Sequence, residues 1–425
     1  MTKKTPLYGR HVARRANMAD FGGYEMPLWY PSGVKKEHLS VLTGAGLFDT
    51  SHMAVLMISG PSAFDLLQRC ITKDLSHCVG KDHLPLVPGR SAYGAFLDSA
   101  GHVIDDAIVN RISEEIFMVV VNAGMGSAIT DHLSKQAGEA SLAVDITDLT
   151  DQVGKIDLQG PASGKILLSV LEDSNVLFNA MPFFSFKGHF DPSFASTEKV
   201  RLVNGTSVLL SRTGYTGEFG FELYMQPDAL EDAWNLLEDA GGPRCCEPCG
   251  LASRDSLRAG ALLPLSHQDI GDWPFINHPW EHALPYDSEK RDFTKTFIGA
   301  DRLLETRGTG YFTLPFAGFD LRKVAQGPGT SVVDAEDRNL GIVLTCVTDV
   351  AIDRQGKRIF SITSPDRPRG FRPRGLCCGF VRTTSPLKVG SMVEIRDDRR
   401  SLPVMIMDDL RPDRTARNPI GTMMA

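Results

Sequence analysis

The chain has 425 residues, a formal net charge of −7, 42% hydrophobic residues and 23% charged residues. A chain of this length is too long to fold around one ordinary hydrophobic core, which predicts two or three domains. The net negative charge gives no reason to expect the basic surface that nucleic-acid binding requires, so we expect no nucleic-acid partner.

No apolar run approaches the roughly 20 residues that a membrane-spanning helix needs. The segment Met1 to Pro6 has no apolar stretch behind its two lysines. We therefore expect no signal peptide, no membrane partner and a cytoplasmic location.

The eight cysteines include two close groups, Cys245-Cys246 with Cys249, and Cys377-Cys378. In a cytoplasmic chain these thiols are expected to be reduced. The two groups would hold zinc only if they met in space, and the adjacent pair lacks the usual ligand spacing. Buried free cysteine is the favoured interpretation, so no metal is predicted, although the sequence leaves metal binding by these clusters open.

The first 150 residues predict a mostly antiparallel α+β module. Residues 6–30 mix aromatic residues with glycine and resemble a lining or packing segment. The regular elements expected after them are a helix at 32–46, a strand at 55–58, a helix at 60–70, strands at 93–98, 107–109 and 116–122 with a hairpin turn at 98–101, and a helix at 127–138.

Two adjacent carboxylates, Asp105 and Asp106, lie between the turn at 98–101 and an apolar run. Neighbouring side chains of a strand point to opposite faces. We therefore expect one carboxylate to face a cavity, and the other to face solvent or cap a backbone group. A carboxylate in a cavity can act as an acid, as a base or as a stabiliser of positive charge. For such a pair alone, two solvated turn-edge residues are the commoner case.

The second half partly repeats the first. Residues 155–163 resemble residues 54–63, because each segment reads as a strand, Gly-Pro and a helix. We interpret them as two related α+β halves. A glycine-rich loop at 212–220 precedes a strand, and 228–240 and 251–258 are expected helices. After residue 310 only short apolar runs remain, which predicts a closing β-barrel or sandwich.

Three charged or titratable side chains are candidates for a site. Glu218, in the glycine-rich loop, could accept hydrogen bonds from a heterocycle with adjacent N–H donors, or it could be solvated. Arg254 lies on a predicted helix and suits either an anion clamp or an ion pair. His52 has no partner spacing for a metal or triad, so a packed histidine is favoured. The dinucleotide, P-loop and serine-hydrolase motifs do not occur in the chain.

Together these segments resemble the glycine-cleavage T-protein (aminomethyltransferase) family and its tetrahydrofolate-dependent relatives. The resemblance extends in order from residue 5 to about 265. Its matching stretches are 5–8, 21–27, 46–53, 103–106, 158–161, 211–221 and 249–258.

The resemblance implies an α+β protein with three domains in a cloverleaf around a central folate channel. Two domains would be α+β and the third a C-terminal β-barrel. The expected limits are 1–54 plus 146–265 for the first domain, 55–145 with part of 266–310 for the second, and 311–425 for the barrel.

The same resemblance assigns residues to a tetrahydrofolate site. Asp105, the first of the pair, would be catalytic and face the reactive nitrogens of the folate. Glu218 would hold the pterin ring, and Arg254 would act beside it. The other positions that the resemblance places at the folate are Met53, Tyr93, Asn122 and Tyr286.

The resemblance weakens after Arg258. The family pattern Leu-Glu-Ala-Gly-Leu-Pro-Leu-Tyr-Gly-His-Glu is replaced by residues 259–269, and 279–284 also departs. The folate half is thus retained and the donor half altered.

The first hypothesis is an aminomethyltransferase whose partner is a lipoyl carrier protein. The second is a folate-dependent demethylase of a sulfonium, amine or aryl ether. The third is a non-catalytic folate-binding protein. The sequence leaves the donor and the oligomeric state open.

Overall fold

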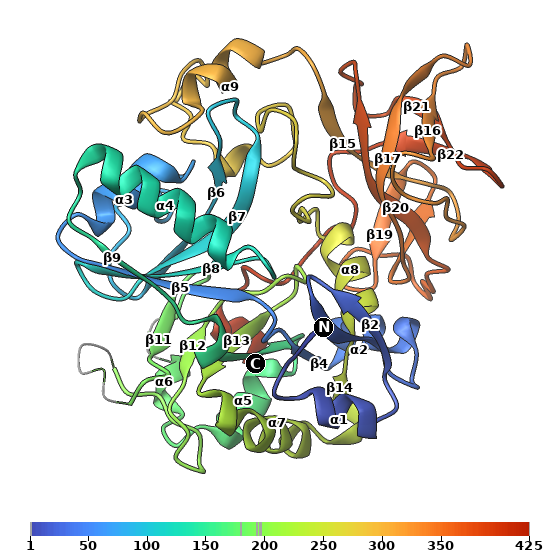
Figure 1. The fold of residues 1–425 in the computed structure, drawn as a ribbon. Coiled ribbons are helices and arrows are strands. Elements are labelled where there is room, and N and C mark those ends of the chain that lie inside the picture. The colour runs from blue at the N-terminus through green and yellow to red at the C-terminus, as the bar shows by residue number, and fades with distance from the viewer. Residues whose placement is uncertain (1, 179–180, 193, 195–197, 425) are drawn as a thin grey trace.

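The computed structural model describes residues 2–178, 181–192, 194 and 198–424. Two mixed α/β assemblies and a closed six-stranded barrel surround the centre of the molecule, where helix α8 (Leu251–Gly260) lies (Figure 1). This architecture confirms the predicted α+β class with a C-terminal β-barrel.

One assembly is a five-stranded sheet in the order β6-β7-β8-β5-β9, with helices on one face (Figure 1). The predicted hairpin turn joins β6 to β7, and Gly101 adopts a φ of 78° there. The elements of this assembly are β5 (Ala54–Ser59), α3 (Ala63–Cys70), β6 (Arg90–Leu97), β7 (Val103–Arg111), β8 (Ile116–Val121), α4 (Gly126–Ala140) and β9 (Asp145–Asp148).

The other assembly is a six-stranded sheet in the order β11-β12-β13-β10-β4-β14. Its elements are β4 (Ala45–Asp49), β10 (Gly154–Gln159), α5 (Ser163–Val170), α6 (Asn175–Phe178), β11 (Phe186–Gly188), β12 (Leu209–Ser211), β13 (Gly220–Met225), α7 (Leu230–Cys245) and β14 (Cys246–Pro248). Next to it lie α1 (Tyr8–Ala13), α2 (Val34–Thr43) and a small sheet of β1 (Lys3–Lys4), β2 (Asn17–Phe21) and β3 (Tyr24–Trp29).

The predicted internal repeat exists in three dimensions. Gly60 and Gly160 follow equivalent strands and have φ angles of 122° and 124°. A Cβ on Gly60 would lie 2.7 Å from a backbone oxygen, and one on Gly160 would lie 2.5 Å from another. Only glycine fits these turns. The strand orders of the two sheets also correspond, except that β4 is inserted beside β10.

The barrel closes in the order β15-β20-β17-β16-β21-β22. Its strands are β15 (Phe312–Ala317), β16 (Ser331–Val333), β17 (Asn339–Asp349), β20 (Leu376–Thr383), β21 (Met392–Arg396) and β22 (Ser401–Ile406), with a separate hairpin of β18 (Ile352–Gln355) and β19 (Arg358–Ser361). The chain then returns to the six-stranded sheet and ends in a short helix, α10 (Ile420–Met424), which the sequence did not predict.

Residues 266–310 read as polar and irregular in the sequence, yet they supply a hydrophobic core between the five-stranded sheet and the barrel. Trp280 is 1% exposed, and its ring lies 5.2 Å from that of Phe380 in the barrel. The same core contains Leu97 and Val103 at the β6–β7 turn. The segment, with its helix α9 (Ala300–Thr306), therefore fixes the β6–β7 hairpin relative to the barrel.

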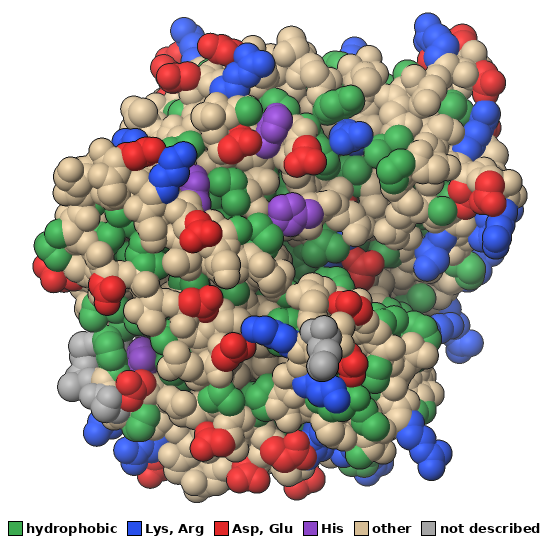
Figure 2. Space-filling model, in the orientation of Figure 1, with side chains coloured by type: hydrophobic (Ala, Val, Ile, Leu, Met, Phe, Trp, Pro, Cys, Tyr) green, Lys and Arg blue, Asp and Glu red, His purple; other side chains and the backbone are tan. Residues whose placement is uncertain are grey.

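Charges of both signs are interspersed on the face drawn in Figure 2. Within the described ranges, none of the helices is both long and apolar enough to span a membrane. All eight cysteines are free thiols.

Candidate active site

Asp105 and Asp106 lie in β7 beside the end of β8. Asp105 is opposite Phe96 and Asp106 is opposite Ala95 in β6, so their side chains start on opposite faces of the sheet, as predicted. Asp105 has no exposed surface, whereas Asp106 is half-buried.

Asn122, which follows β8, joins the two carboxylates. Its Nδ2 donates to Asp105 Oδ1 at 2.7 Å and to Asp106 Oδ1 at 2.6 Å. Its backbone N–H donates to Asp105 Oδ2 at 2.8 Å. The hydroxyl of Tyr93 donates to Asp106 Oδ2 at 2.9 Å. Asp105 thus caps a backbone group, and Asp106, which is half-buried, is the member of the pair that contacts Tyr93.

The surroundings raise the pKa of both carboxyls. Burial raises the pKa of Asp106 to about 7, and the adjacent charge of Asp105 adds to the effect. Burial also raises the pKa of Asp105, and the two hydrogen bonds from Asn122 oppose it. The pair can therefore hold or release a proton near neutral pH.

Arg254 contributes to a buried ion-pair network on the six-stranded sheet. Its Nη1 lies 2.7 Å from Asp157 Oδ2, and Lys155 Nζ lies 3.2 Å from the other oxygen of Asp157. The guanidinium of Arg254 also lies 4.9 Å from the centre of the Tyr215 ring. Tyr215 donates its hydroxyl to the carbonyl of Pro264. Arg254 therefore orients the glycine-rich loop that carries Glu218, in addition to forming the ion pair considered from the sequence.

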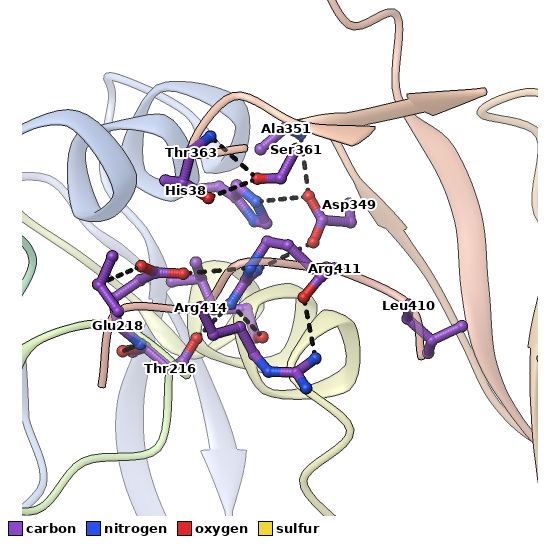
Figure 3. Close-up of polar contacts among 12 residues, drawn as sticks. His38, Thr216, Glu218, Asp349, Ala351, Ser361, Thr363, Leu410, Arg411 and Arg414 are labelled. Atoms are coloured by element: carbon purple, nitrogen blue, oxygen red, sulfur yellow. Dashed lines mark hydrogen bonds and ion pairs between the residues drawn. The ribbon is translucent and has the colours of Figure 1, made fainter. Parts of the chain in front are cut away.

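Glu218 faces the C-terminal segment (Figure 3). Its Oε2 accepts a hydrogen bond from Thr415 Oγ1 at 2.6 Å, and its Oε1 lies 3.2 Å from Arg411 Nε. Neither Oε1 nor that Nε has an aligned hydrogen-bond partner within the described residues. Burial raises the pKa of Glu218, and the charge of Arg411 opposes this rise.

The network continues from Arg411 into the barrel. Arg411 Nη1 donates to Asp349 Oδ2 at 2.9 Å, and His38 Nε2 lies 2.9 Å from Asp349 Oδ1 (Figure 3). Despite burial, the charges of His38 and Arg411 lower the pKa of Asp349 to about 2. One chain of buried charges therefore joins the glycine-rich loop, the C-terminal segment, the barrel and α2.

Met53 and Tyr286, the remaining predicted site residues, pack outside the carboxyl pair and the ion-pair networks. Met53 is half-buried, directly before β5, at the edge of a core that includes Val55 and Met118. Tyr286 packs on Phe293 and under Arg307. Among the described residues, the neighbours of Tyr286 do not include the carboxyl pair.

Two features of the centre were missed in the sequence. Ser266 is buried, and its hydroxyl interacts with Asp105 and lowers the pKa of that carboxyl. Arg411 and Thr415 were not considered, because partners 193 or more positions from Glu218 leave no local pattern. Within the described ranges, no group of three or more potential metal ligands occurs.

A family profile, curated sequences and a solved structure all match this chain, and all three concern the GCVT domain or aminomethyltransferases. The profile of the GCVT N-terminal domain matches residues 7–274. An aminomethyltransferase of Symbiobacterium thermophilum is 36% identical over 310 residues, which are 72% of this chain and 76% of the relative. That of Bacillus subtilis is 36% identical over 270 residues, or 64% and 67% of the two chains. The crystal structure of glycine cleavage system aminomethyltransferase T from Bartonella henselae matches with a TM-score of 0.72 and 26% identity, covering 96% of this chain and 97% of that one.

Proposed function

This chain belongs to the GCVT family, and from that premise we propose that it is a tetrahydrofolate-dependent aminomethyltransferase that receives its one-carbon unit from a lipoyl carrier protein. The observation that carries the proposal is the carboxyl pair, in which a half-buried Asp106 has a pKa near neutrality and is held by Asn122 and Tyr93. The aminomethyltransferases named above and the family match support the reaction class.

Tetrahydrofolate supplies the nitrogens that accept the one-carbon unit. Asp106, which is half-buried and has a pKa of about 7, would hold or take up the proton that this transfer displaces. Asp105 would act through Asn122, because it has no surface that a ligand can touch. We thus propose Asp106, rather than the predicted Asp105, as the carboxyl that contacts the folate. Together the two carboxyls also stabilise positive charge in a partly dehydrated site.

The remaining predicted residues would hold the folate. Glu218 would accept hydrogen bonds from the N–H donors of an amino-pyrimidine edge through Oε1, which requires its buried ion pair with Arg411 to open. Arg254 would act by orienting Tyr215 and the glycine-rich loop. We keep Met53, Tyr93, Asn122 and Tyr286 as folate-lining residues, Tyr286 without a supporting contact.

The proposal is tested by supplying an aminomethylated lipoyl carrier with tetrahydrofolate and following methylene-tetrahydrofolate. Asp106→Asn should lower turnover by about 10²-fold or more while calorimetric folate affinity stays within a few fold. Asp145→Asn, an exposed carboxylate in β9, serves as the control and should keep full rate. Full turnover in Asp106→Asn would refute the catalytic role.

A panel of methyl donors separates the second hypothesis from the first. Ser266 stands where the family pattern has tyrosine, which alters the surroundings of Asp105. Formation of methyl-tetrahydrofolate from a sulfonium, amine or aryl ether, with none from the carrier, would replace the aminomethyl donor by a methyl donor.

A further inference from the structure

The connection from β19 to β20 is rich in arginine. Residues 367–370 and 372–375 both read Arg-Pro-Arg-Gly, with Phe371 between them. All four arginines of this repeat are exposed. We call residues 364–375 the arginine loop. Because the whole chain has a net charge of −7, the loop is a positive surface on a negative molecule.

Both ends of the arginine loop are fixed by hydrogen bonds to other segments. The hydroxyl of Ser364 donates to Asp413 Oδ2 at 2.6 Å, which holds the loop against the C-terminal segment. The backbone N–H of Arg374 donates to Asp353 Oδ2 in β18 at 3.1 Å. The two Arg-Pro-Arg-Gly units therefore lie between two attached points.

The backbone between these points has little conformational freedom. Pro368 and Pro373 fix their own φ angles, and Gly370 turns the chain with a φ of 77°. The N–H of Phe371 donates to the carbonyl of Pro368 at 3.0 Å, and its ring centre lies 6.2 Å from that of Phe360 in β19. A loop that is ordered in this way loses less conformational entropy when a partner binds.

The nearby acids leave three of the four arginines without a carboxylate. Asp366, the acid within the loop, pairs with the two Nη atoms of Arg358 in β19, at 2.6 and 3.1 Å. Arg374 Nε lies 3.5 Å from Asp353 Oδ2. The loop arginines that form no ion pair with any described residue are Arg367, Arg369 and Arg372. Each of them retains N–H donors that an added carboxylate can accept.

The charge of the remaining molecule distinguishes between possible anionic partners. Nucleic-acid binding increases with the number of phosphates that are neutralised, and three arginines on a chain of net charge −7 neutralise few. An anionic membrane is also extended, so it would face the acids of the chain as well as the loop. A protein segment can contact the loop alone, and arginine and aromatic side chains are typical anchors of protein interfaces.

We propose that the arginine loop is a docking surface for an acidic protein segment, whose aspartate or glutamate carboxylates bind Arg367, Arg369 and Arg372. The loop leaves the β18–β19 hairpin, whereas the carboxyl pair lies in β7 of the five-stranded sheet. The inference therefore adds a partner-binding surface to the transferase and does not depend on folate binding. Since these ion pairs form in solvent, they should speed association and weaken as the salt concentration rises.

Fluorescence anisotropy with a labelled decaglutamate peptide tests the proposal. At about 0.1 M salt, charges more than about 10 Å from the peptide are largely screened. The wild-type chain should bind this peptide and should not bind neutral decaglutamine. The combined variant R367A/R369A/R372A should weaken decaglutamate binding by about tenfold, because each exposed ion pair contributes at most a few fold.

The matched control removes the same charge from three other segments. Its combined substitutions, all at exposed positions, are R15A, R201A and R244A. The control should bind decaglutamate as the wild type does.

Three results would overturn the docking surface. The first is a wild-type chain that does not bind decaglutamate. The second is an equal loss of affinity in the control variant, which would assign binding to net charge. The third is tighter binding by the loop of a single-stranded oligonucleotide or of phosphatidylserine vesicles than of the peptide. All three leave the proposed folate function standing, because folate affinity and turnover are measured separately.

Discussion

Asn122 gives two carboxyls on opposite faces of one strand a common hydrogen-bond donor. Asp105 uses one oxygen for a backbone N–H and has no exposed surface, whereas the half-buried Asp106 contacts Tyr93. The choice between adjacent aspartates thus depends on one amide at the end of the next strand. The family resemblance predicts Asp105 as the catalytic member of the pair, and the hydrogen bonds lead us to propose Asp106 for this role.

The raised pKa of Asp106 predicts a pH-dependent stability. In the folded chain it is about 7, against an ordinary value of 3.8. The folded state keeps a proton that the unfolded state loses, so this contribution is complete below about pH 4 and disappears as the pH rises through 7. Asp106→Asn should therefore gain stability relative to the wild type between pH 4 and pH 8. Urea unfolding across this range measures it, and a constant difference would contradict the raised pKa.

The C-terminal segment after β22 acts as a tether across two assemblies. It begins at the barrel and places Arg411 between Glu218 and Asp349 (Figure 3). It ends with α10 on the core around α5. The local sequence did not predict this role, because the segment has no periodic pattern. Its stability comes from partners distant in the chain.

Removing Arg411 should be costly. Arg411→Ala leaves Glu218 and Asp349 buried without their cation, and such a loss costs about 3–5 kcal/mol. Arg414→Ala is the matched control. Arg414 pairs with Asp409 at 2.5 Å near the surface, where such pairs contribute about 0–1 kcal/mol. Chemical denaturation of both variants measures the difference. Equal losses would show that the buried network is not the stabilising feature.

One hydrophobic core contains residues of the five-stranded sheet, of segment 266–310 and of the barrel, and it joins these three parts of the molecule. Trp280, on a segment that reads as polar, packs between the β6–β7 turn and the barrel. Because the reacting carboxyls are in β7, this junction also determines where they lie relative to the other assemblies.

Trp280→Ala should cost about 3–5 kcal/mol, the range for removing a buried aromatic side chain. It should also reduce turnover more than folate affinity, because β7 loses its support. Trp29→Ala, at a site 38% exposed, is the control and should change stability little. Thermal unfolding and steady-state rates measure both effects. A Trp280→Ala protein with wild-type stability would contradict the role of this core.

The sequence by itself determined the local elements, the repeated strand–Gly-Pro–helix unit, the closing barrel and the family. These depend on periodicity, glycine geometry and motifs, which act over a few residues. The tertiary structure decided how Asp105 and Asp106 share Asn122, how Glu218 is held, and how Trp280 joins the β6–β7 turn to the barrel. Those outcomes depend on burial and charge pairing between residues far apart in the chain, which composition and spacing do not encode.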